Sequence, residues 1–374
     1  MSSPDRPDGV HSEPAVPSAL PFQIQSVASV GALPSVGSAR LTRATGMRGR
    51  HPLVWYIARR VAAGVVTLLV ASALIFVATN ALPGNVAEAV LGKQATPQRV
   101  ALLERELHLN DSFVSRYGSW LVGTLHGDLG QSATELAEGA SSTSVTGLIG
   151  RPLFNSGVLA MLTVILLIPL SLLVGTLAAV RSGRCSDYAI SYASLALGSL
   201  PEFVLGTFLI VIFFSALHVL PPVALVPLGS SPFAHPNALV LPVLTLLGIS
   251  LAFCSRQVRA GVIESLRQDY VTAARLGGIR ERRVLWRYAL RNALAPSVQT
   301  FAQATQYLLG GIIIVESLFA YPGIGQLLVQ EVLLRDVTLV QGITLVLAAI
   351  YIAINIAADI LVVWLVPKLR TGFQ

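Results

Sequence analysis

Chemically reactive side chains are scarce in this sequence, and the motifs of common catalytic sites are missing from it. There are only two cysteines, Cys185 and Cys254, and the six histidines include no pair at metal-ligand spacing. No GxxxxGK(S/T) phosphate loop, HExxH, CxxC or GxSxG motif occurs. We therefore expect no metal site, no catalytic residue and no ATP hydrolysis by this chain. A polytopic membrane enzyme, which would need clustered His, Asp, Glu or Cys near one membrane face, is disfavoured.

Charge is also scarce, because charged residues make up 12% of the 374 residues, hydrophobic residues make up 53%, and the mean hydropathy is +0.69. This composition is too apolar for a soluble domain. A helix needs roughly 20 apolar residues to cross ~30 Å of hydrocarbon. The sequence predicts an all-α polytopic membrane protein with six transmembrane helices, at about Val54–Leu82, Phe154–Val180, Tyr188–Leu217, Ala238–Phe253, Ser297–Phe319 and Val340–Val366. A secondary carrier built from repeated halves is disfavoured, since no internal repeat is visible.

Basic residues are distributed unevenly among the segments that join these spans. Of the 26 Lys and Arg residues, 20 fall in residues 1–60, 181–187, 255–295 and the C-terminal tail, and six fall in the remaining segments. The positive-inside rule places the first group, and with it both termini, in the cytoplasm. The net charge of +7 does not indicate nucleic-acid binding, because the excess lies beside spans and no aromatic-basic platform accompanies it.

Three parts of the chain differ in composition. Residues 1–50 are rich in Pro, Ser, Ala and Gly without periodicity, which predicts a disordered N-terminal tail. Residues 51–150 contain the first span and an outer region, where Thr96 as N-cap and Pro97 after it predict the start of a helix. Residues 151–370 contain five further spans and a long cytoplasmic loop, residues 256–296.

This loop is the longest polar interval between two apolar segments, and it contains nine arginines but only three acidic residues. We expect Asp269 to be the N-cap of a short helix that ends at Leu276. The following Gly277 and Gly278 offer the left-handed conformation that ends helices, and Arg275 suits the dipole of the last turn. A separately capped helix between two spans is typical of a docking surface.

Acidic residues also occur inside the predicted spans, at Glu202, Glu316 and Asp359. Such residues are costly in lipid and commonly face a bundle interior or a wet cavity. Together with Gln303 they are candidates to line a substrate pathway, and helix–helix hydrogen bonding is the alternative. Three internal prolines are expected to bend their helices; they are Pro169, Pro201 and Pro242.

The loop resembles the cytoplasmic motif of ABC importer permeases, which reads EAA, three residues, Gly, nine residues, I-x-L-P. Thr272–Ala274 stands at EAA, Gly278 at the glycine, and Tyr288–Arg291 at I-x-L-P. The departures from that pattern resemble the oligopeptide, dipeptide and nickel branch of the family. Further stretches agree from Leu53 to Arg370: ALPGN, RYGSWL, GDLGQS, LGSLPEF, VESLFAYPGIGQLL and RDVTLVQG. Asn85 and Glu202 depart from the residues usual at their positions.

The resemblance implies a type I importer permease fold in the inner membrane, with a loop helix that couples to a cytoplasmic ATPase. The residues it assigns to that coupling are Asp269, Tyr270, Thr272, Ala273, Ala274, Arg275, Gly277 and Gly278. It implies a second homologous permease, two ATPase subunits that use ATP and Mg²⁺, and an extracytoplasmic substrate-binding protein. No cofactor is expected on this chain itself. The implied substrates are peptides, or alternatively nickel or another small solute.

A basic stripe follows the loop helix, formed by Arg283, Arg287 and Arg291 at spacings of four residues. Four-residue spacing places side chains on one face of a helix. The stripe could contact either the ATPase or anionic lipid head groups. The sequence leaves these two partners open.

Overall fold

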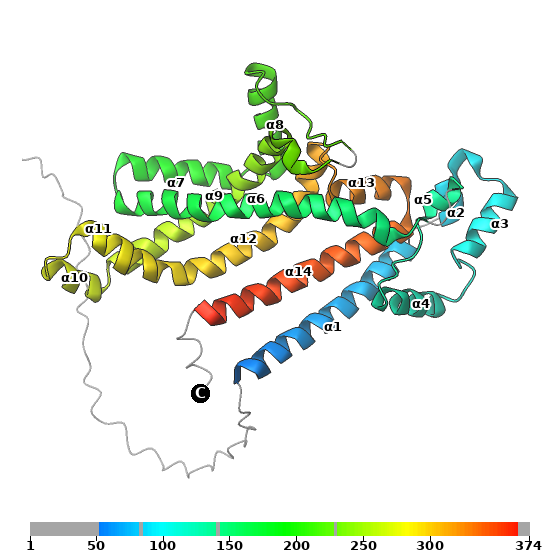
Figure 1. Cartoon of the computed structure of the whole chain (residues 1–374), viewed down its shortest axis with the longest axis horizontal. Coiled ribbons are helices and arrows are strands. Elements are labelled where there is room, and N and C mark those ends of the chain that lie inside the picture. Colours follow the sequence, from blue (N-terminus) through cyan, green and yellow to red (C-terminus); the bar gives the residue numbers. More distant parts are fainter. Residues whose placement is uncertain (1–51, 82–84, 140–142, 228–229, 366–374) are drawn as a thin grey trace, which may run out of the picture. The chain divides into compact units, whose positions relative to one another are not determined.

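The computed structural model describes residues 52–81, 85–139, 143–227 and 230–365 (Figure 1). These residues belong to one compact unit of the chain, Gly49–Gln374. The tail expected over residues 1–50 lies outside the described residues. Within the described ranges the only β pairing is an isolated antiparallel bridge between Gln131 and Ser144. The all-α fold expected from the sequence is confirmed.

Short helices follow the long first helix, α1 (Pro52–Asn80), in the segment that the sequence predicts to be the outer region. They are α2 (Val86–Leu91), η1 (Gly92–Gln94), α3 (Pro97–Glu106), α4 (Phe113–Leu125) and α5 (Ala133–Ala137). The hydroxyl of Thr96 accepts a hydrogen bond from the Arg99 amide at 3.4 Å, and Pro97 is the first residue of α3. The predicted helix start is thus confirmed. Asn85 caps α2 in the same way, accepting from the Ala87 amide at 2.9 Å.

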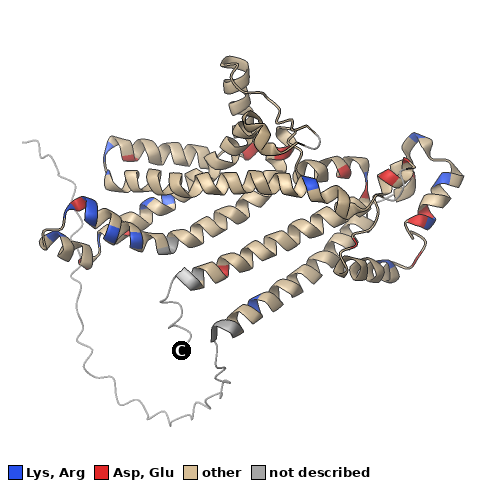
Figure 2. Ribbon diagram, viewed as in Figure 1, with Lys and Arg blue, Asp and Glu red and all other residues tan. Residues whose placement is uncertain are grey.

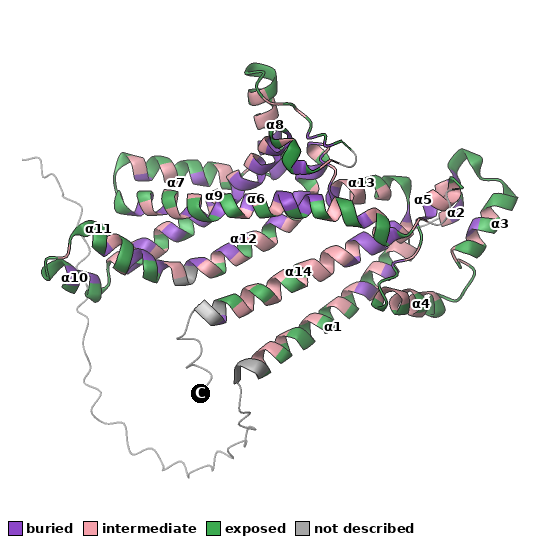
Figure 3. Cartoon of the chain, viewed as in Figure 1, coloured by how far each residue is buried: buried purple, intermediate pink, exposed green. Residues whose placement is uncertain are grey.

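The core consists of long helices packed around α9, as the buried residues in Figure 3 indicate. These helices are α6 (Val145–Val180), α9 (Pro236–Leu266) and α12 (Leu290–Leu318), and a further long helix, α14 (Val337–Leu365), packs against α1 and α12. The most apolar stretch of α9 is 72% buried within the chain, against 28% for that of α6. Helix α9 packs against both α6 and α12, whereas α1 packs mainly against α14. Consequently α9 is the central helix, whereas the apolar stretch of α1 is only 17% buried within the chain.

Five of the predicted spans correspond to continuous helices long and apolar enough to cross a membrane. The third span is broken into two helical segments. The first is α7 (Cys185–Gly198), and the second, Glu202–Ala216, comprises α8 (Glu202–Ile210) and the π-helical η2 (Val211–Ala216). The two segments meet at an angle of 106°. Pro201 provides no amide hydrogen to continue α7 and disfavours helical backbone at Leu200. In contrast, Pro169 and Pro242 lie inside the continuous helices α6 and α9. Counting the bent pair as one span gives six.

Two connections tie the last helices to the rest of the chain. The first, α13 (Ile324–Leu334), lies between α12 and α14. The second is the carboxylate of Asp336, which is fully buried and accepts hydrogen bonds from the Ser132 hydroxyl at 2.6 Å and the amides of Thr134 and Leu339 at 3.0 and 2.9 Å. Asp336 therefore caps α14 and anchors the outer region to it.

Candidate functional site

The cytoplasmic loop expected from the sequence folds into three short helices between α9 and α12. They are α10 (Asp269–Leu276), α11 (Glu281–Arg283) and the π-helical η4 (Val284–Ala289). A single-turn 3-10 helix, η3 (Pro232–Ala234), precedes α9 at the opposite end. Figure 2 shows that Lys and Arg residues gather on α10, α11 and the start of α12, while most of the long helices carry few charged residues.

The N-terminus of α10 differs from the expectation. The residue at the cap is Gln268, whose backbone is extended (φ −73°, ψ 147°) and whose side chain makes no capping bond. The side-chain nitrogen Nε2 of Gln268 instead donates a hydrogen bond to Oε1 of Glu264 at 2.8 Å. Asp269 is the first helical residue, so the prediction that it is the N-cap is wrong. Its carboxylate acts in the first turn, where negative charge interacts favourably with the helix dipole.

The C-terminus of α10 is a Schellman motif, and the left-handed residue is Gly278. Its φ is +77°, while Gly277 has φ −76°. The Ile279 amide donates to the Ala274 carbonyl at 3.1 Å and the Gly278 amide donates to the Arg275 carbonyl at 3.0 Å. These are the two bonds that define the motif. The predicted glycine exit is confirmed at Gly278.

One face of α10 is anchored to the helices that follow it. Val271 and Val284 are fully buried and Ala274 is 8% exposed, and these three form a small apolar cluster with Ile279 and Tyr288 beside them. Ala274 therefore belongs to the internal packing of the loop. The cluster holds α10 on η4, so that the loop helix moves with the start of α12.

The opposite face of α10 is open. Seven of the eight residues expected to dock are exposed, all except Ala274; they are Asp269, Tyr270, Thr272, Ala273, Arg275, Gly277 and Gly278. Leu276 is 86% exposed, which is unusual for a large apolar side chain at the end of an anchored helix. The expectation from the sequence missed Leu276. Leu276 is two residues beyond Ala274, so on a helix its side chain points away from the face that Ala274 buries, and this spacing could have indicated its exposure.

The exposed charges near α10 are partly paired. The guanidinium of Arg275 donates to both carboxylate oxygens of Glu281, at 2.8 and 3.2 Å. This pair links the last turn of α10 to α11, although exposed pairs of this kind contribute only about 0.2–1 kcal/mol. Arg283, Arg287 and Arg291 are all exposed, and no ion pair involving them occurs among the described residues.

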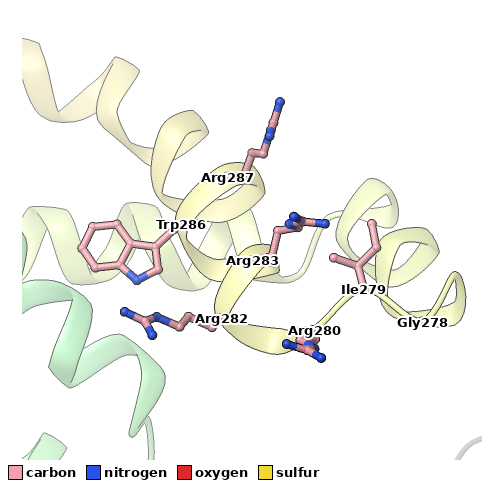
Figure 4. Close-up of a pocket in the computed structure, with 7 residues that line it drawn as sticks. All are labelled: Gly278, Ile279, Arg280, Arg282, Arg283, Trp286 and Arg287. Atoms are coloured by element: carbon pink, nitrogen blue, oxygen red, sulfur yellow. The ribbon is translucent and has the colours of Figure 1, made fainter.

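A hollow of about 800 Å³ lies beside the basic stripe (Figure 4). Its lining includes Arg280, Arg282, Arg283, Arg287 and Trp286. Only the first two members of the stripe, Arg283 and Arg287, line it; Arg291 does not. Arg287 lies in the π-helical η4, and such segments are common at functional positions.

Within the membrane-spanning part, Glu202 on α8 and Gln303 on α12 belong to two helices that pack against each other. Glu202 is the first residue of α8, after the break in the third span, and it is 9% exposed. Tyr307 on α12 lies within hydrogen-bonding reach of it. Gln303, one turn before Tyr307, lines a cavity of about 370 Å³ together with Tyr307 and Arg256 of α9. The lining of this cavity therefore contains the polar or charged residues Gln303, Tyr307 and Arg256, and buried Glu202 lies next to it through Tyr307.

Glu316 has a different environment from that expected of a pathway residue. Its side chain is fully buried and accepts hydrogen bonds from the Ser156 hydroxyl at 2.5 Å and the Gly325 amide at 2.7 Å. A Cβ at Gly323 would lie 2.1 Å from Glu316 Oε1, so the approach of the carboxylate requires glycine there. Glu316 thus caps α13. The alternative given for it, a hydrogen bond between helices, describes its contacts in this structure.

Asp359 on α14 also has a partner within the chain. It forms an ion pair with Arg60 of α1, and both side chains are partly exposed. This pair joins the two helices that pack at the edge of the unit. The alternative of a helix–helix interaction therefore describes Asp359 in this conformation.

Five long apolar helices and one bent helix pair make this chain a polytopic helical membrane protein. The sequence matches the family described as binding-protein-dependent transport system inner membrane component over residues 171–371, and the N-terminal model of such membrane components over residues 53–140. The chain belongs to this family. It is therefore a multi-pass inner-membrane subunit of a transport system and not an enzyme.

Three relatives show the range of the family around this chain. A putative peptide transport system permease protein from Brucella abortus is 32% identical over 314 residues, which cover 84% of this chain and 98% of the relative. A glutathione transport system permease protein from Shigella flexneri is 30% identical, covering 84% and 98%. A metal-staphylopine import system permease protein from Staphylococcus aureus is 28% identical, covering 85% and 98%.

Proposed function

We propose that this chain is a permease subunit of an ATP-driven importer of di- or oligopeptides. The name of the Brucella relative supports a peptide substrate, and so does the Shigella relative, because glutathione is itself a tripeptide. The name of the staphylococcal relative favours the alternative, a small solute that carries metal. Peptides remain the main proposal because more than one of the similar proteins is named for them.

The energy for import enters through α10. The observation that carries this proposal is the division of α10 into an anchored face, with Val271 and Ala274 buried, and an open face that includes 86%-exposed Leu276. A helix arranged in this way can fit a groove on a cytoplasmic ATPase and still transmit force to α12. The partner subunits bind ATP and Mg²⁺, since this sequence carries no phosphate loop.

The remaining partners follow from the same proposal. Two ATPase subunits lie on the cytoplasmic side, a second homologous permease completes the pathway, and an extracytoplasmic protein delivers the substrate. Both termini of this chain face the cytoplasm, as the 20-to-6 division of basic residues supports. Membrane lipid surrounds α1, whose exposed apolar side chains include Val65 and Leu74.

In this proposal the pathway runs along the cavity that Gln303, Tyr307 and Arg256 line, and Glu202 adjoins it through Tyr307. A carboxylate and a guanidinium on one face suit a zwitterionic substrate such as a peptide. The second permease would close this face from the other side. Glu316 and Asp359 are left out, because one caps α13 and the other pairs with Arg60.

Replacing Leu276 by Asp tests the docking proposal. The side chain is almost fully exposed, so the change should leave the chain folded and inserted in the membrane. We expect uptake of a labelled dipeptide by a deletion strain to fall at least tenfold, and the ATPases to be lost when the complex is purified through a tag on this chain. Leu125→Asp is the matched control, because Leu125 ends α4 in the outer region and is 75% exposed.

Normal uptake and retained ATPases in Leu276→Asp would show that α10 is not the docking helix. The substrate is tested in the same strain by competition. Unlabelled dipeptides should inhibit uptake of the labelled one. Growth on peptides that is unaffected by deleting this gene, combined with lost uptake of chelated nickel, would favour the metal-solute alternative instead.

A further inference from the structure

The hollow beside η4 is strongly basic and uncompensated. Four arginines line it, Arg280, Arg282, Arg283 and Arg287, and all are exposed. None of them takes part in an ion pair among the described residues. The nearest acidic residue in sequence, Glu281, is occupied by Arg275. Guanidinium groups bind phosphate oxygens through paired hydrogen bonds, so this hollow suits an anion of the phosphate class.

An apolar groove adjoins the hollow. Its volume is about 570 Å³, and it runs along α6 from Pro169 to Val180 against Leu285, Trp286 and Leu290 of η4 and α12. Large apolar side chains are open on it, because Leu173 is 64% and Trp286 61% exposed. Eleven residue steps of helix span about 16 Å, which is about one leaflet of a hydrocarbon core ~30 Å thick.

Trp286 lines both the hollow and the groove. Figure 4 shows the side chain of Arg282 extending to the same side of η4 as the Trp286 ring, whereas Arg287 points away from it. Tryptophan is favoured at the boundary between hydrocarbon and head groups. The two cavities therefore form one amphipathic site, with an anion-binding part at the membrane surface and an apolar part within the inner leaflet.

We propose that this site binds an anionic glycerophospholipid of the inner leaflet, with its phosphodiester among the arginines and an acyl chain along α6. The inference rests on the proposed function for its orientation, which places residues 256–296 at the cytoplasmic surface. An ATPase could contact the arginines but would not fill the apolar groove, because a water-soluble partner does not enter the membrane as far as Leu173. The lipid would brace η4, on which α10 is anchored, against α6.

Quenching by brominated lipids tests the proposal on the full-length chain. A single-tryptophan chain that retains Trp286 and carries Phe at Trp55, Trp120 and Trp364 is placed in bilayers with brominated phosphatidylglycerol or brominated phosphatidylcholine. We expect phosphatidylglycerol to bind beside Trp286 at least fivefold more strongly. Excess inorganic phosphate should not displace it, because free phosphate lacks the acyl chains.

Arg282 supplies the decisive variant, since it lines the hollow but lies outside the basic stripe. Arg282→Gln should lower the preference for phosphatidylglycerol about fivefold, as expected for one arginine near a membrane surface, and Arg282→Lys should largely restore it. Arg184→Gln is the matched control, because Arg184 is exposed in the turn between α6 and α7 and lines neither cavity. It should leave the preference unchanged.

Three outcomes would overturn the proposal. Equal quenching by the two lipids would show that the site does not select an anionic head group. An equal loss in the Arg282 and Arg184 variants would reduce the effect to general surface charge. An unchanged preference in Arg282→Gln, with ATPases lost on purification, would make the hollow a protein contact. The uptake experiment with Leu276→Asp does not depend on lipid binding. The proposed transport function therefore stands even if the lipid experiments contradict the lipid site.

Discussion

Arg259 on α9 donates hydrogen bonds to both carboxylate oxygens of Asp187 on α7, from Nε at 2.6 Å and from Nη2 at 2.8 Å. The Asp187 side chain is only 3% exposed, and it also accepts from the Gly183 amide at 3.0 Å. This pair fastens the first turn of α7 to the part of α9 that leads directly into α10. Movement of the loop helix is therefore linked to the broken third span as well as to α12.

Breaking this pair should destabilise the chain. Asp187→Ala leaves Arg259 without its partner beside a buried position, and we expect a loss of about 3 kcal/mol. Arg259→Gln alone should cost a similar amount, while the double substitution should cost clearly less than the sum. Thermal unfolding of the purified chain measures all three variants. Additive losses would mean that the two residues act independently of one another.

The topology can be checked by labelling. In a chain whose Cys185 and Cys254 are replaced by alanine, single cysteines at Glu138 and Gln268 should react with a membrane-impermeant thiol reagent from opposite faces, because an odd number of spans separates them. Both positions are exposed, so access does not limit the reaction. Labelling of both from the same face would contradict the arrangement of six spans.

Local signals in the sequence predicted local structure well. The cap at Thr96 and the left-handed exit at Gly278 depend on a few neighbouring residues, and both occur where the sequence indicates. The positions of the long helices followed from apolar runs that any membrane span requires. The start of α10 was missed by one residue because Asp is favourable both at the cap and in the first turn, so the sequence alone does not choose between them.

Features set by tertiary contacts could not be predicted. Glu316 is buried because Ser156, 160 residues earlier, and the amide of Gly325 satisfy it. The third span bends by 106° at Pro201, whereas Pro242 lies within a continuous helix. The residues next to these two prolines do not predict this difference. The exposure of Leu276 likewise depends on which face of α10 packs against Val284. Each is decided by a partner distant in the sequence or by the packing of a whole helix.

Glu331 on α13 should make the stability of the chain depend on pH. Burial raises the pKa of its carboxyl to about 7, and the nearby carboxylates of Asp336 and Glu135 act in the same direction. An unfolded glutamate titrates near 4.5, so the folded chain holds this proton more tightly and its stability falls as the pH rises through this window. We expect the Tm to fall between about pH 5 and pH 8.

Glu331→Gln should remove most of that fall and raise the Tm at the upper end of the range, because a neutral amide cannot ionise. Glu138→Gln, an exposed carboxyl of the outer region, should leave the profile unchanged and serves as control. The measurement is thermal unfolding of the purified full chain in a series of buffers. A profile of Glu331→Gln that coincides with that of the unsubstituted chain would assign the pH dependence to other groups.

Gly278 offers the sharpest test of the loop as a mechanical link. Its φ of +77° lies where a residue with a Cβ is strained by roughly 1–2 kcal/mol, yet a Cβ added there would meet no atom within 4 Å. Gly278→Val should therefore distort the end of α10 without a clash inside the chain. We expect membrane insertion to persist, dipeptide uptake to fall at least tenfold and the ATPases to be lost on purification.

Gly139 provides the matched control for this substitution. Its φ is +80° and the space around its Cβ position is equally open, but it lies in the outer region just after α5. Gly139→Val introduces the same backbone strain at a site remote from α10, and it should leave uptake and ATPase retention nearly intact. Equal losses in the two variants would indicate general destabilisation. Normal uptake in Gly278→Val, with its ATPases retained, would show that the geometry of this turn plays no part in coupling.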